Sequence, residues 1–272
     1  CRGGRGLRTS VLKSLEHQRR PVHDEEHRER TGDIGDPQQR SDSPKLALKQ
    51  QRGLEVLAVA RLIAQVLESL RAIAGGLHGK IAVTYVEWAG TNSQVVVVPW
   101  MLVASRADAE QVVKQLTARP PNSARRTSIS AALEFGADLF AESGFEGSKR
   151  VIDISGDGPN NQGAPVPVVR DAVLKQGIVI NGLPLMTNGG MESSYDIRDL
   201  DKYYRDCVIG GPGAFMIPVN GWEQFPEAVR RKLVLELADA ASPQRTADEA
   251  AHPPIVLAQA TSTIDCLAGE KR

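Results

Sequence analysis

Short β-branched runs alternate with amphipathic helical runs from residue 80 to about residue 238, and this alternation constrains the fold more than any other feature. The runs that predict strands lie at 80–88, 94–100, 151–155, 178–185 and 214–219. Between them, apolar residues recur every three or four positions, as they do on one face of a helix. Such an alternation is typical of an α/β fold with a doubly wound, mostly parallel sheet of Rossmann-like topology.

The first two predicted strands form a hairpin. The runs KIAVTYVEW (80–88) and QVVVVPW (94–100) are separated by a turn that contains a glycine. Pro99 has no N–H to donate, so we expect the second strand at an edge of the sheet. Ser105 and Asp108 then form a capping box that starts a helix.

Composition divides the chain into three parts. Residues 1–53 are polar and contain no aromatic residue, so we expect a disordered or irregular segment. Residues 54–241 carry the apolar periodicity of a folded domain, in which Leu54–Ala60 fits either a helix start or a short strand. Residues 242–272 are polar and contain prolines, which predicts a flexible tail.

Charge, apolar run length and cysteine content limit the partners, membrane spans and disulfides that we expect for this chain. The 33 basic residues equal the 33 acidic ones, so no net field favours nucleic acid. No apolar run of about 20 residues predicts a membrane span, and no signal peptide is visible. Cys1, Cys207 and Cys266 allow one disulfide, whose pairing the spacing leaves open.

Two loops carry oxygen ligands to the expected carboxyl edge of the sheet. Thr127 and Ser128 start a helix, and Ser155, Asp157 and Asn160 follow a buried strand. Ligands of open α/β sheets bind at this edge, and hydroxyl and carboxylate oxygens suit Mg²⁺, Mn²⁺ or Ca²⁺. The alternatives are that Thr127 is only an N-cap and that Asp157 and Asn160 are only turn residues.

Six strings stand in this order along the chain: HGKIAVTYVEWAG, RRTSISAALEFGADL, KRVIDISGDGPNNQG, INGLPL, YYRDCVIGGPGAF and RRKLVLELA. Together they resemble a bacterial family of unknown function related to von Willebrand factor type A domains. The resemblance covers about residues 71–238 and implies that fold.

The resemblance also implies a metal-ion-dependent adhesion site. Such a site combines a D-x-S-x-S motif after the first strand, a Thr in a second loop and an Asp in a third, which places Thr127 and Asp157 in the second and third loops. No D-x-S-x-S occurs in this sequence, so we expect the first strand to be absent or replaced, and Mg²⁺ or another divalent cation to bind weakly or not at all. Asp153-x-Ser155-x-Asp157 imitates the motif, but Asp153 falls inside a strand and is expected to point away from its end.

These features lead to the hypothesis of a non-enzymatic binding or adhesion module with an unknown protein partner, exported to the periplasm as the resemblance implies. One alternative is a metal-assisted hydrolase on the same loops, and another is a truncated or frameshifted product without function.

The pair His23 and His27 is interpreted as part of a solvated charge run. Residues 210–213 (GGPG) lack phosphate-loop spacing and are interpreted as a tight turn.

Overall fold

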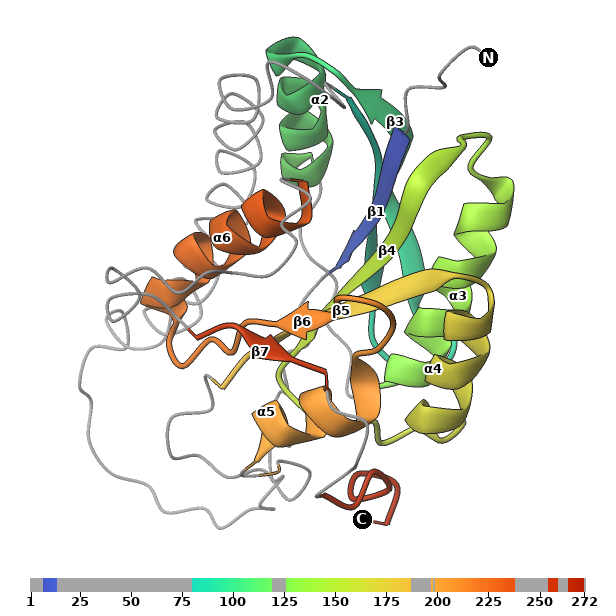
Figure 1. Cartoon of the computed structure of the whole chain (residues 1–272), viewed down its shortest axis with the longest axis vertical. Helices are drawn as coiled ribbons and strands as arrows, with labels where there is room; N and C mark the ends of the chain where they lie inside the picture. Colours follow the sequence, from blue (N-terminus) through green and yellow to red (C-terminus); the bar gives the residue numbers. More distant parts are fainter. Residues whose placement is uncertain are drawn as a thin grey trace, which may run out of the picture.

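The computed structural model describes residues 7–13, 80–118, 126–186, 197, 199–237, 254–258 and 264–271. Within these ranges, seven strands form one sheet in the order β3-β2-β1-β4-β5-β6-β7 (Figure 1). The strands are β1 (Leu7–Lys13), β2 (Ile81–Trp88), β3 (Gln94–Val103), β4 (Gly147–Gly156), β5 (Ile178–Pro184), β6 (Phe215–Met216) and β7 (Val256–Leu257). The helices are α2 (Arg106–Thr117), α3 (Ile129–Glu142), α4 (Val166–Lys175), α5 (Leu200–Tyr203) and α6 (Phe225–Leu237), with a π-helical turn η1 (Tyr204–Val208) and a 3-10 turn η2 (Trp222–Gln224).

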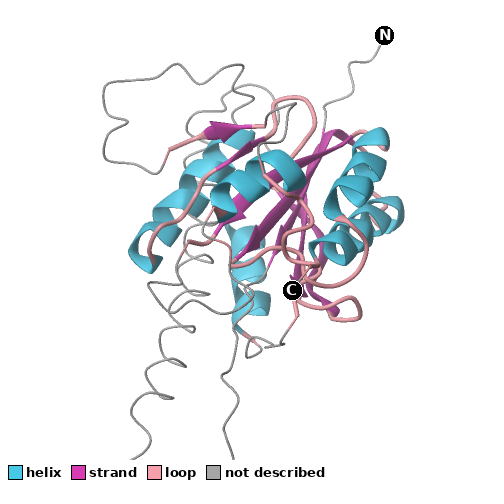
Figure 2. Cartoon of the chain, turned by 90° about the horizontal axis from the view of Figure 1, so that it is seen from below, coloured by secondary structure: helices cyan, strands magenta, loops and turns pink. Residues whose placement is uncertain are grey.

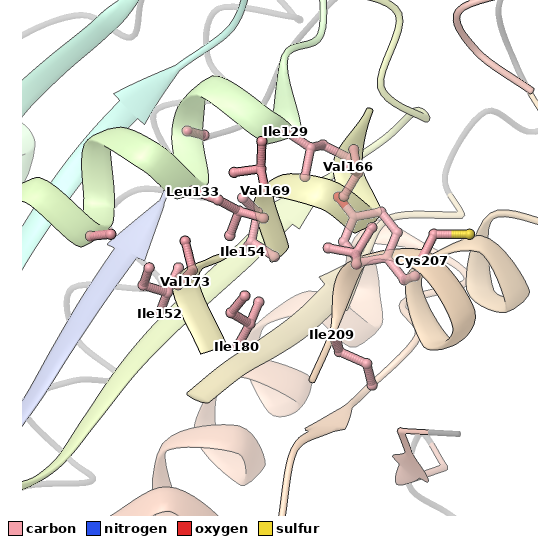
Figure 3. Close-up of a cluster of buried hydrophobic side chains, with 14 of the residues drawn as sticks. Ile129, Leu133, Ile152, Ile154, Val166, Val169, Val173, Ile180, Cys207 and Ile209 are labelled. Atoms are coloured by element: carbon pink, nitrogen blue, oxygen red, sulfur yellow. The ribbon is translucent and has the colours of Figure 1, made fainter. Parts of the chain in front are cut away.

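Helices cover both faces of the sheet, as a doubly wound fold requires. Helices α3 and α4 lie on one face and α2 and α6 on the other (Figures 1 and 2). Each face has its own apolar core, one built on α3, α4 and α5, the other on α2 and α6. The first core is shown in Figure 3, where side chains of β4 and β5 meet those of α3 and α4. The predicted α/β class with a mostly parallel sheet is therefore confirmed.

The central strand of the sheet comes from the segment expected to be irregular. β1 pairs in parallel with β2 on one side, from Arg8↔Ile81 to Lys13↔Val86, and with β4 on the other, from Leu7↔Gly147 to Val11↔Ile152. The expectation for residues 1–53 is therefore corrected at residues 7–13. The first strand is replaced rather than absent, because two neighbouring strands with unpaired backbone groups need a partner between them. Leu54–Ala60, the alternative occupant, lies outside the described residues.

The hairpin and the first helix agree with the sequence-based predictions. β2 and β3 are antiparallel, and β3, which contains Pro99, is an edge strand. At the start of α2, the Ser105 hydroxyl accepts from Asp108 N at 3.2 Å, and Asp108 Oδ2 accepts from Ala104 N at 3.0 Å. Ser105 thus caps the helix as predicted, and Asp108 bonds back to Ala104 N, one residue before the N-cap donor of an ideal capping box.

The tail is more ordered than its composition predicts. β7 adds an antiparallel strand beside β6, and residues 264–271 pack against the body of the domain through Ile264 and Cys266. The expectation of a flexible segment at 242–272 is therefore corrected for 254–258 and 264–271. The tail is ordered because a disulfide, described below, joins it to the body of the domain, and the sequence did not assign that disulfide.

Candidate functional site

The two loops predicted to carry ligands are joined by hydrogen bonds. The backbone oxygen of Thr127 accepts from Asn161 N at 2.9 Å and Gln162 N at 3.2 Å, and Thr127 N donates to Asn161 Oδ1 at 2.9 Å. Thr127 Oγ1 lies 3.9 Å from the point that a Cβ on Gly158 would occupy. Thr127 thus lies beside the residue that follows Asp157, at the carboxyl ends of β4 and β5. Thr127 is buried, whereas Asp157 is half-buried.

Ser128, rather than Thr127, caps helix α3. The Ser128 hydroxyl accepts from Ala131 N at 3.2 Å, and Ser128 N donates to Ala89 O at 2.7 Å. The alternative that Thr127 is the N-cap is therefore wrong. The hydroxyl of Ser128 serves the helix end, which needs acceptors for its unpaired N–H groups.

Asn160 holds the loop together and is fully buried. Its Oδ1 accepts from Ser130 N at 3.2 Å, its Nδ2 donates to Ala164 O at 3.2 Å and to Glu270 Oε1 at 2.8 Å, and its backbone N donates to the Tyr203 hydroxyl at 3.3 Å. Burial raises the pKa of Tyr203, so this phenol stays protonated at neutral pH. Both ends of the Asn160 amide are therefore engaged in hydrogen bonds that hold the loop to α3 and to residue 270.

Residues 264–271, called here the C-terminal strap, lie across this loop. A disulfide joins Cys207 in η1 to Cys266 in the strap, which settles the pairing that the sequence left open. Gly269 approaches the loop so closely that a Cβ there would overlap the backbone oxygen of Asn160. Figure 1 shows the strap at the end of the sheet where β4 and β5 finish. Sequence reasoning missed Gly269 and Glu270, because no local pattern connects them to a loop about 110 residues earlier.

Ser155 and Asp153 lie on β4 and are both buried. Asp153 is turned toward helix α6, and its Oδ1 accepts from Lys232 Nζ. Lys232 Nζ also donates to Glu236 Oε1 at 2.5 Å. Burial, and next the charge of Glu236, raise the pKa of Asp153 well above its ordinary value. Asp153 therefore belongs to a buried ionic cluster and not to the carboxyl edge.

Among the residues that the structure describes, the candidate loops offer too few oxygen ligands to complete a divalent cation site. Thr127 and Asp157 offer one hydroxyl and one carboxylate, whereas Mg²⁺ or Ca²⁺ takes six or more oxygens. β1 ends in Lys13, with no D-x-S-x-S motif to follow it. Within the described ranges, no group of three or more His, Cys, Asp or Glu side chains could hold a metal ion.

Three other sequence features concern a turn, a histidine pair and a membrane span. Gly211 and Gly213 have positive φ angles of 98° and 70° in the connection between η1 and β6. This geometry fits the predicted tight turn, because glycine adopts it without steric penalty. His23 and His27 lie outside the described residues. Among the helices that the structure describes, none has the length and apolar character to cross a membrane.

Comparison with known proteins gives a family and a fold. The sequence model of the family described as "Protein of unknown function (DUF1194)" matches residues 50–241. Proximal thread matrix protein 1 from the mussel byssus is similar in structure, with a TM-score of 0.53 and 11% identity over 86% of this chain and 48% of that one. The pilus adhesin SpaC from Lactobacillus rhamnosus GG has a TM-score of 0.51 and 9% identity over 86% of this chain and 30% of that one.

A von Willebrand factor type A protein from Catenulispora acidiphila is also similar, with a TM-score of 0.47 and 10% identity over 85% of this chain and 43% of that one. The chain thus spans about half the length, or less, of these solved proteins. The comparison with curated protein sequences gave no match. The chain belongs to the family described as "Protein of unknown function (DUF1194)", and it shares its doubly wound α/β fold with proximal thread matrix protein 1 and the pilus adhesin SpaC.

Proposed function

We propose that this chain is a non-enzymatic binding module that docks a protein partner at the carboxyl edge of its sheet, around Thr127 and Asp157. The observation that carries the proposal is the pinning of the Thr127 loop to the loop after β4 by three hydrogen bonds. A surface held in this way is ordered before a partner arrives, which reduces the entropy lost on binding. Asp157 lies at its rim and is half-buried.

Two further observations support a binding role. Two proteins of similar fold are, by name, a thread matrix protein and a pilus adhesin, both of which suggest attachment rather than turnover. The strap also braces the loop through Asn160 and leaves Asp157 half-buried. We therefore place the contact surface at Asp157 and the start of α3, beside the strap.

A divalent cation has a minor role in this proposal. With Thr127 and Asp157 as the protein donors, most of the coordination sphere would be water. Mg²⁺ should bind in the millimolar range at best, which corresponds to about 4 kcal/mol. Calorimetric titration with Mg²⁺ measures this, and micromolar binding would mean that other residues supply the missing ligands.

We further propose that the protein works in an exported, oxidising compartment such as the periplasm. The Cys207–Cys266 disulfide supports this, since such bonds persist in oxidising compartments and are rare in the cytosol.

Selection of peptides from a displayed random library against the full chain tests the binding role. We expect the selected peptides to lose about tenfold or more in affinity on Asp157→Ala, equivalent to about 1.4 kcal/mol. Asp138→Ala is the matched control, because Asp138 is an exposed carboxylate on α3. Peptides that bind both variants equally would contradict the proposed surface. Turnover of phosphatase or esterase substrates that depends on Asp157 would favour the hydrolase alternative instead.

A further inference from the structure

Three ionisable side chains meet in the interior between β4 and α6. Lys232, Asp153 and Glu236 are exposed by only 4%, 5% and 5% of their surfaces. Lys232 Nζ contacts Asp153 Oδ1 and donates to Glu236 Oε1 at 2.5 Å. A buried amine in direct contact with two carboxyl groups is uncommon, because each charge loses its hydration.

The cluster is held in place by neutral neighbours. Asn181, fully buried on β5, donates from Nδ2 to Glu236 Oε1 at 2.7 Å and accepts from Phe215 N at 3.0 Å on Oδ1. The Phe215 ring lies 5.2 Å from Lys232 Nζ. The amine and the carboxyl groups therefore share a fixed geometry in a site with little access to water.

Asp153 is incompletely paired in this arrangement. Its Oδ2 is buried and has no hydrogen-bond partner among the described residues. A conventional ion pair leaves that oxygen unsatisfied, which is unfavourable in a protein interior. Amide formation would consume one carboxyl oxygen and remove the charges of both partners.

We propose that Lys232 and Asp153 become joined by an intramolecular amide bond, with Glu236 as the catalytic residue. One proton of the Lys232 ammonium first passes to the Asp153 carboxylate, which leaves a neutral amine beside a carboxylic acid. The Nζ lone pair then attacks Cγ of Asp153, a new Nζ–Cγ bond forms, and the Cγ–OH bond breaks. Glu236 takes the second proton from Nζ and gives it to the departing hydroxyl, which leaves as water. An ammonium and a carboxylate thus give one amide and one water, with no oxidant, reductant or other reactant.

Direct contact between the two groups and their burial favour this reaction, so that it needs no separate enzyme. Two groups held in reacting geometry behave as if their concentration were very high, on the order of 10⁵ M or more in well-oriented cases. Exclusion of water also disfavours the reverse reaction, hydrolysis. The product would tie the central strand β4 to the last helix of the body, α6, through residues 79 positions apart.

Intact-mass spectrometry of the full chain, reduced and denatured before measurement, tests the proposal. We expect a mass lower than that of the sequence by one water. Trypsin should then release residues 151–170 joined to residues 232–245, because an acylated Lys232 is no longer a cleavage site. A cooperatively unfolding wild-type chain with the full sequence mass overturns the proposal.

Two variants separate this bond from other losses of water. Lys232→Arg keeps the positive charge and should have the full mass; the loss of one water in this variant would point to dehydration elsewhere, such as cyclisation at Asp157-Gly158, and would overturn the assignment. Glu236→Gln keeps an acceptor for Asn181 and should show a joined fraction smaller by about tenfold or more. A Glu236→Gln chain joined as fully as the wild type would overturn the role of Glu236.

Discussion

The two faces of β4 are held by different chemistry. Toward α3 and α4, the strand presents Ile152 and Ile154, each 2% exposed, within an apolar core (Figure 3). Toward α6, the residue between them is Asp153, which meets Lys232 and Glu236. One face is stabilised by removal of apolar surface from water, which depends little on orientation. The other depends on Asp153 and Lys232 staying together, as an ion pair or as the proposed amide, so a single substitution should affect it more specifically.

Disruption of the central strand should have the largest effect, because β1 borders β4 and serves both faces. Val11→Pro removes an N–H from a strand paired on both sides, at Thr84 and Ile152, and should destabilise by at least about 3 kcal/mol. Val11→Thr keeps the N–H and is the control. Urea denaturation followed by circular dichroism measures both. Equal stability of the two variants would mean that β1 does not hold the sheet together.

Removal of the amine should strongly affect the ionic face. Lys232→Met leaves Asp153 and Glu236 buried together without a cation, which destabilises by about 3–5 kcal/mol. Lys114→Met, at an exposed lysine of α2, should change stability by less than about 0.5 kcal/mol. If Lys232→Met proved as harmless as its control in thermal and urea unfolding, the ionic cluster would have no structural role.

Truncation on the apolar face should have an effect of similar or smaller size. Leu133→Ala, at a fully buried residue of α3, should destabilise by about 2–5 kcal/mol through lost burial and an unfilled cavity. Val168→Ala is the control, since Val168 is 66% exposed on α4. Unlike Lys232→Met, Leu133→Ala should lose the same free energy at pH 5 and pH 8. A marked pH dependence of that loss would erase the distinction between the faces.

The smallest expected effect is the pH dependence of the ionic face, best measured in Lys232→Arg, where the carboxyl group of Asp153 stays free. Burial raises the folded-state pKa of Asp153 above 3.8, so the folded state binds that proton more tightly than the unfolded state. This stabilisation is complete below pH 3.8 and declines as pH rises toward the raised pKa. Adding Asp153→Asn should remove the decline. If the contribution of Asp153 to the free energy of unfolding rose with pH instead, the predicted direction of the pH dependence would be wrong.

In the wild-type chain, the stability of the folded state at high pH depends on the charge of Lys232. Burial alone lowers the pKa of Lys232, but the charges of Asp153 and Glu236 outweigh it, and the pKa lies above its ordinary 10.5. Before any amide forms, the stabilisation from this ammonium is therefore complete below pH 10.5 and lost above it.

The sequence predicted the body of the fold but not its central strand. Alternating strands and helices from residue 80 onward are local patterns, and the structure reproduces them as β2 to α6. LRTSVLK has no such periodic context, since Gly and Arg precede it and a charged run follows. Its strand state depends on distant partners in β2 and β4, and single-sequence patterns do not contain that information.

The candidate site was predictable only where it depended on sheet topology. Thr127 and Asp157 follow from the rule that the carboxyl ends of parallel strands meet, and their loops do lie together. The bracing of Asn160 by Glu270 depends on the Cys207–Cys266 pairing, which three cysteines could not specify. The partners of Asp153 were also hidden, because an aspartate between isoleucines does not reveal which helix packs over it.

The position of β1 also sets an order of events during synthesis. These residues leave the ribosome well before their neighbours in the sheet, which begin only at Ile81 and Gly147. A nascent chain must therefore keep an unpaired strand until β4 has emerged, and pairings between such distant segments form slowly. During that interval, exposed strand edges can pair with other chains. Arginines and glycines around LRTSVLK reduce this risk while the strand is unpaired, since charge and glycine both oppose edge-to-edge association.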